Sequence, residues 1–91
     1  DPTLRRQRVR RQILGRELRK ALATGTLDVA LQPQLSIREG HHLGFEALLR
    51  WRLRRHDIDP IETIAIAEEE NLIGKLSARI IDKALSHVAA L

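Results

Sequence analysis

The chain lacks cysteine, methionine and tyrosine, and it has one phenylalanine and one tryptophan, Phe45 and Trp51. Without cysteine, disulfide bridges and thiolate metal sites are excluded. No apolar run approaches the ~20 residues that a membrane-spanning helix needs, so we expect no membrane segment and a cytoplasmic protein. Because no initiator methionine precedes Asp1 and Pro2, we expect the chain to be cut from a longer protein with an upstream signalling domain.

Positive charge is concentrated at one end of the sequence. Residues 1–20 carry eight lysines and arginines against Asp1 and Glu17, whereas residues 21–91 carry eight against ten acidic residues. The basic character is therefore local, and any nucleic-acid interface would have to lie on the first twenty residues.

The first segment has the pattern of an amphipathic helix. Apolar side chains recur at steps of three and four over residues 4–23, and Gly25 supplies the helix end. No aromatic side chain is interleaved with the arginines for base stacking, so we expect no nucleic-acid partner. We interpret residues 1–25 as a basic amphipathic linker helix whose arginines are solvated.

The next segments predict a β-hairpin. Residues 26–37 alternate imperfectly between apolar and polar side chains, residues 38–40 form a turn signal, and residues 44–51 are an apolar run. In an antiparallel pair with this turn, Gln32 should lie opposite Glu46.

The remaining sequence predicts a loop and two helices. Residues 52–59 read as a charged loop, residues 60–70 as a helix that begins with proline, and residues 74–90 as a helix with one apolar face. Asn71 suits a left-handed residue at the end of the first of these helices. We expect the acidic triplet at residues 68–70 to be solvated.

Two charged side chains stand out on the apolar run. Because side chains alternate along a strand, Glu46, Leu48 and Arg50 share one face. A structural ion pair at a strand end would explain the two charges. A functional site would also explain them, because a carboxylate can ligate a divalent cation and a guanidinium can bind phosphate.

Four ordered segments carry a resemblance to a known family. Residues 46–51, Glu-Ala-Leu-Leu-Arg-Trp, resemble the signature that names the EAL family of cyclic di-GMP phosphodiesterases, and Gly44 precedes it at the family's spacing. Residues 31–34, Leu-Gln-Pro-Gln, resemble the family's Tyr-Gln-Pro segment. Residues 60–73 resemble its Pro-x-x-Phe-Ile-x-x-Ala-Glu-x-x-Gly-Leu-Ile segment.

The resemblance implies an α/β fold, a modified (β/α)8 barrel of the TIM type whose first strand is antiparallel to the second. Such barrels typically need about 250 residues, so the chain should form only the N-terminal portion, with one β-hairpin and three helices. We expect residues 26–91 to be the truncated N-terminal part of an EAL domain. An apolar face left uncovered in this fragment would favour a homo-oligomer.

The resemblance also implies a function and a set of site residues. The family hydrolyses cyclic di-GMP to linear pGpG with Mg²⁺ or Mn²⁺. Carried over by motif, Glu46 would be a metal ligand, Arg50 a phosphate contact, Gln32 a nucleotide contact and Leu48 a wall beside the ligand. The family's other metal ligands and its catalytic lysine come from strands beyond residue 91, so no catalytic residue is expected in this fragment.

Two interpretations of the function are therefore compatible with the sequence. In the first, the parent domain is a metal-dependent cyclic di-GMP phosphodiesterase and the fragment alone is inactive. In the second, the domain is a non-catalytic EAL module that binds cyclic di-GMP or a protein partner. Thr63 stands for the family's phenylalanine and Ala65 for its proline, and both departures are compatible with the second interpretation.

Overall fold

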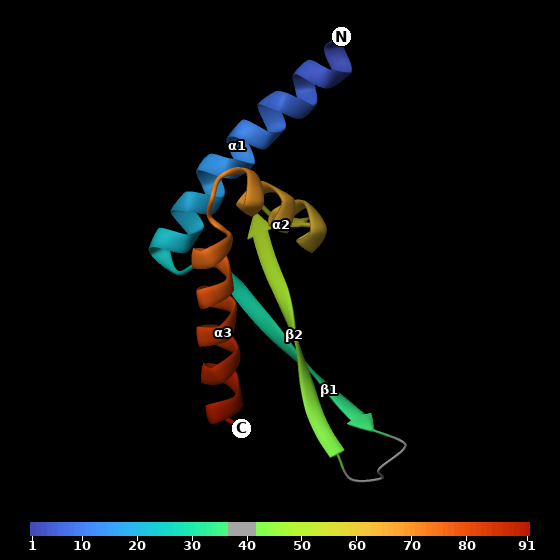
Figure 1. Ribbon diagram of the computed structural model, residues 1–91, viewed down its shortest axis with the longest axis vertical. Coiled ribbons are helices and arrows are strands. Elements are labelled where there is room, and N and C mark those ends of the chain that lie inside the picture. The colour runs from blue at the N-terminus through green and yellow to red at the C-terminus, as the bar shows by residue number, and fades with distance from the viewer. Residues whose placement is uncertain (37–41) are drawn as a thin grey trace.

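The computed structural model describes residues 1–36 and 42–91. Along the chain these residues form α1 (Pro2–Thr24), β1 (Asp28–Ser36), β2 (His42–Leu53), β3 (His56–Ile58), α2 (Pro60–Glu69) and α3 (Ile73–Ala89). The result is a mixed α/β structure with three helices and an antiparallel three-stranded sheet in the order β1-β2-β3. Figure 1 shows the three helices and the long β1–β2 hairpin. The turn expected at residues 38–40 lies outside the described residues.

The ends of the helices follow from local chemistry. The carboxylate of Asp59 accepts a hydrogen bond from the Ile61 N–H at 2.8 Å, and Pro60 occupies the first turn of α2, where a missing N–H costs nothing. Gly25 ends α1 with φ 70°, and Asn71 follows α2 with φ 57°. Both left-handed positions were predicted from the residue types.

A third strand occupies the segment that the sequence analysis interpreted as a loop. Residues 56–58 pair with Trp51, Arg52 and Leu53 of β2. The prediction that residues 52–59 form a charged loop is therefore wrong. The two residues between the strands, Arg54 and Arg55, have φ values of 50° and 70°. Such a two-residue connection normally uses Asn-Gly, because side chains with a Cβ disfavour positive φ.

The core lies on one face of the β1–β2 hairpin. Alternation sends Leu27, Val29, Leu49 and Trp51 toward the helices, and each of these side chains is buried. The helices cover this face with the buried residues Leu14, Leu18, Leu22, Ile66, Leu72 and Leu76. Burial of Trp51, which is 3% exposed, contributes the largest single side chain to this core.

Ion pairs join the basic helix α1 to the acidic residues of α2. Arg10 contacts Glu62, Arg11 contacts Glu69 and Arg19 contacts Glu70, at N to O distances of 2.9, 3.1 and 2.9 Å. The paired arginines are exposed to solvent, as expected, but the sequence analysis did not predict that they pair with acidic side chains. Because α1 and α2 pack together, the basic side chains of α1 lie next to the acidic side chains of α2 and Glu70.

The molecule is elongated rather than compact. Its radius of gyration is 15.9 Å, against about 12 Å for a compact domain of this length. The N-terminal half of α1 and the far end of the β1–β2 hairpin project from the body in opposite directions (Figure 1). Among the described residues, no helix is long and apolar enough to cross a membrane.

Candidate functional site

The four residues singled out from the sequence lie on the face of the β1–β2 hairpin opposite the core. Gln32 is the direct cross-strand partner of Glu46, as the hairpin register predicted. Leu48 and Arg50 follow Glu46 on the same face. Glu46, Arg50 and Gln32 are exposed, and Leu48 is half-buried. The arrangement is a single open row of polar groups with one apolar side chain in it.

A fifth residue of this face was missed by the sequence analysis. The Nε2 of Gln34 donates a hydrogen bond of 2.8 Å to the Oε2 of Glu46. Gln34 pairs with Gly44, which has no side chain, so the amide can reach the neighbouring carboxylate diagonally. The signal was present, because Gln34 follows Gln32 by two residues and must share its face.

The structural ion-pair interpretation of Glu46 and Arg50 is wrong. Four residues along a strand separate their Cα atoms by roughly 13 Å. Within the described residues, no ion pair joins the two side chains, and the partner of the Glu46 carboxylate is the neutral amide of Gln34. The two charges therefore stand apart on one surface and do not neutralise each other directly.

The Arg50 end of the row lies beside further carboxylates. Arg50 is the cross-strand partner of Asp28 and borders a hollow of about 340 Å³ that Asp57 and Asp59 also line. The N–H of Val29 donates a 2.8 Å hydrogen bond to the Asp28 carboxylate and lowers its pKa, and the His87 imidazole, 3.3 Å away, lowers this pKa further. Asp28 is therefore an ionised group at neutral pH.

The donor set on this face suits a divalent cation only in part. Glu46 offers a hard carboxylate oxygen, and the amide oxygens of Gln32 and Gln34 are further oxygen donors on the same face. Among the described residues, no group of three acidic, histidine or cysteine side chains is placed to hold a metal ion. Glu46 can contribute one ligand, and further carboxylates would have to come from other elements.

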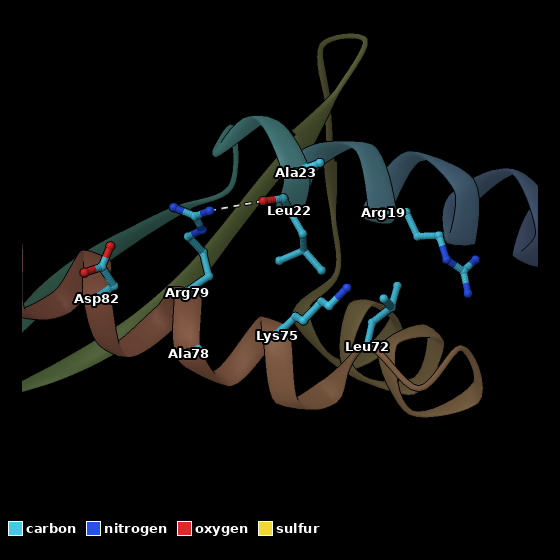
Figure 2. A pocket seen from close by; sticks show the side chains of 8 residues that line it. All are labelled: Arg19, Leu22, Ala23, Leu72, Lys75, Ala78, Arg79 and Asp82. Atoms are coloured by element: carbon cyan, nitrogen blue, oxygen red, sulfur yellow. Dashed lines mark hydrogen bonds between the residues drawn. The ribbon is translucent and has the colours of Figure 1, made fainter.

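A larger hollow lies elsewhere and involves none of these residues. It has a volume of about 590 Å³ and is lined by the last turns of α1 and by α3. Figure 2 shows that the guanidinium of Arg79 crosses it and donates to the backbone oxygen of Leu22, at 3.1 Å. This hydrogen bond satisfies a backbone carbonyl in the last turn of α1. The hollow therefore lies where the end of α1 packs against α3.

Comparison with known proteins decides the family. The model of the EAL domain matches residues 15–91. The chain belongs to the EAL domain family. The match begins inside α1 and includes both strands of the hairpin and the helices that follow.

Curated relatives of this EAL chain are much longer proteins. An uncharacterized protein of Sinorhizobium fredii is 45% identical over 81% of this chain and 9% of its own length. The biofilm architecture maintenance protein MbaA of Vibrio cholerae is 34% identical over 90% of this chain and 10% of its own length. The probable cyclic di-GMP phosphodiesterase PdeI of Escherichia coli is 37% identical over 79% of this chain and 9% of its own length.

The chain thus spans about a tenth of the length of these relatives. No solved structure matches it significantly.

Proposed function

We propose that this chain contributes the first part of a cyclic di-GMP site in an EAL phosphodiesterase domain. The observation that carries the proposal is the open row on the hairpin, where Gln32 and Glu46 are paired in register and Arg50 lies on the same face. The name of the Escherichia coli relative as a probable cyclic di-GMP phosphodiesterase supports the choice of substrate.

In this proposal each residue of the row has a separate task. Glu46 is a ligand of Mg²⁺ or Mn²⁺, and Gln34 orients its carboxylate by the 2.8 Å hydrogen bond. Arg50 binds a phosphate of the dinucleotide through its planar guanidinium. Gln32 hydrogen-bonds to the nucleotide, and Leu48 supplies an apolar wall. When bound, the metal polarises the phosphate and activates water.

The proposal requires more protein than this chain supplies. Residues of α3 at one-turn intervals, Ile81, Leu85 and Val88, are 60%, 64% and 44% exposed. A stripe of this kind normally packs against another element. We propose that the remaining strands and helices of a TIM-type barrel cover it and provide the other metal ligands and the catalytic residues.

We further propose that the complete protein is cytoplasmic and carries an upstream signalling domain, to which residues 1–25 are the linker. The chain's match to about a tenth of its relatives' length is compatible with several additional domains. Self-association of the 91-residue chain through uncovered apolar surface is part of the same proposal.

A second candidate function is a non-catalytic EAL module that binds cyclic di-GMP or a protein. The observation that favours it is Thr63, which is fully buried in α2 and donates its hydroxyl to the Asp59 carbonyl at 3.1 Å. A phenylalanine, which the family has here, would not fit this packed position without displacing its neighbours. The packing around position 63 of α2 is therefore adapted to a residue smaller than phenylalanine.

Turnover of cyclic di-GMP by the full domain separates the two candidates. Glu46→Gln removes the metal-binding charge while keeping the size of the side chain, and turnover should fall at least 100-fold. The control is Glu68→Gln, which changes an exposed carboxylate on α2 and should leave turnover unchanged. Undiminished turnover by Glu46→Gln would refute the proposed role, and inactive but dinucleotide-binding wild-type protein would establish the second candidate.

A further inference from the structure

A groove runs between the N-terminal half of α1 and the β2–β3 turn. Its volume is about 670 Å³, and it lies away from the Gln32–Glu46 row. Val9 and Ile13, which are 47% and 43% exposed, stand one helical turn apart along one wall. Leu53 of β2 lies on the other side. The centre of the groove is therefore apolar and open to solvent.

The rim of this groove carries an excess of positive charge. Arg5, Arg6 and Arg54 line it, and Asp57 is the one acidic residue among its lining residues. Arg10 also borders the groove, but its guanidinium is engaged by Glu62. Three arginines against one carboxylate leave a net positive rim around an apolar strip.

One of these arginines, Arg54, lies at a strained position of the backbone. Arg54 has φ 50° in the two-residue turn, a conformation that disfavours any residue with a Cβ atom. Asparagine or glycine would occupy the turn at lower free energy. Strained residues tend to cluster at binding sites, so the arginine at this position suggests a role for its side chain.

We propose that this groove, which we call the arginine groove, docks an amphipathic α-helix of a partner protein that carries glutamate or aspartate beside its apolar face. Apolar residues at one-turn spacing on the partner would enter between Val9 and Leu53. Carboxylates on either side of them would meet Arg5, Arg6 and Arg54. None of the residues proposed to contact cyclic di-GMP or its metal lines this groove, although Asp57 lines both the groove and the hollow beside Arg50.

The groove's chemistry favours a helix over two other occupants. A nucleic acid would be expected to stack bases on aromatic side chains, and no phenylalanine, tyrosine or tryptophan is present among the groove's lining residues, which offer only the imidazole of His56. An added strand would have to pair with β3, which is three residues long and offers a short edge. Neither alternative uses the apolar wall of α1.

The binding test uses the 91-residue chain and a synthetic probe. The probe is a fluorescent 18-residue helical peptide with leucines at i, i+4, i+7 and i+11 and glutamates flanking them. A control peptide has lysine in place of every glutamate. We expect saturable binding of the glutamate peptide, weakened by added salt because the rim charges are exposed. The lysine peptide should bind at least tenfold more weakly.

Matched variants locate the binding. Ile13→Ser should weaken binding at least fivefold, whereas Ile64→Ser, which changes a side chain 41% exposed on α2 outside the groove, should not. Arg5→Ala combined with Arg6→Ala should weaken it similarly, and Arg8→Ala, outside the groove, should not. These substitutions are at exposed positions, and circular dichroism will verify that each variant is folded.

Three results would overturn the proposal. The first is absence of binding to the glutamate peptide at 100 µM. The second is equal binding of the lysine peptide, or equal effects of the groove and control variants. The third is self-association of the chain that Ile13→Ser abolishes and Ile64→Ser does not, which would make a second copy the occupant.

Discussion

Arg10 and Glu62 are joined by two parallel hydrogen bonds of 2.9 Å, although 52 residues of chain separate them. The guanidinium donates through Nε and one terminal nitrogen to both carboxylate oxygens, which is the geometry that an arginine fork favours. The pair fixes the projecting half of α1 against the first turn of α2. It lowers the pKa of Glu62 and raises that of Arg10, the hydrogen bond being the main cause in each case.

This pair should contribute modest, pH-dependent stability. Arg10 is 57% and Glu62 32% exposed, so we expect a coupling free energy of about 0.5–1 kcal/mol. Because the folded-state pKa of Glu62 is lowered, its contribution is complete above the ordinary glutamate pKa of about 4.3 and is lost as the pH falls through the lower folded-state value.

A double-mutant cycle with Arg10→Ala and Glu62→Ala, measured by urea unfolding, tests this at two pH values. The coupling should be present at pH 7 and absent near pH 2. The control cycle pairs Arg8→Ala with Glu62→Ala and should give no coupling. Coupling that is equal at both pH values would contradict the role given to the Glu62 charge.

Gly15 of α1 leaves room for the side chain of Glu70, the residue that follows α2. A Cβ at this position would lie 3.1 Å from Oε1 and 3.2 Å from Cδ of Glu70, whose other carboxylate oxygen is held by Arg19 at 2.9 Å. Replacing a helical glycine by alanine normally raises the free energy of unfolding by about 1 kcal/mol. Because of this contact, Gly15→Ala should fail to give that increase. Gly74→Ala is the matched control, because its Cβ would meet nothing within 4 Å and should stabilise.

Thermal and urea unfolding of the single and combined variants check this explanation. In an Arg19→Ala background the Glu70 side chain can move, so Gly15→Ala should recover part of its helix-propensity gain. If Gly15→Ala stabilises wild-type protein as much as Gly74→Ala does, the contact with Glu70 imposes no constraint.

The β2–β3 turn stores backbone strain. Replacing Arg54 by Asn and Arg55 by Gly supplies the residues that positive φ favours, and should raise the free energy of unfolding by about 1 kcal/mol. Replacing both by alanine removes the same charges without relieving the strain, so it should give no such gain. Equal stabilisation by both pairs would attribute the effect to charge and not to conformation.

The structural features that the sequence predicted are those that depend on residues close together in the chain. The three helix ends at Gly25, Pro60 and Asn71 were identified because capping is a property of a few adjacent residues. The opposition of Gln32 and Glu46 was predicted because one turn position determines the register of a whole hairpin. The shared face of Glu46 and Arg50 follows from the two-residue period of a strand.

The features that were missed depend on tertiary contacts. β3 was read as a loop because it requires Arg54 and Arg55 at positive φ, which residue type argues against. The ion pairs of α1 were missed because the packing of α1 on α2 is not encoded in either segment alone. Gln34 was overlooked because its link to Glu46 is diagonal and depends on the absence of a side chain at Gly44.

Affinity of the full domain for cyclic di-GMP in the presence of Mg²⁺ tests the central claim most directly, by comparing wild type with Arg50→Ala in equilibrium titration calorimetry. A lost guanidinium–phosphate contact costs about 1.5–3 kcal/mol, so the Kd should rise at least tenfold. Arg8→Ala, on the far half of α1, should leave the Kd unchanged. An unchanged Kd for Arg50→Ala would contradict the assignment of the hairpin face as the dinucleotide site.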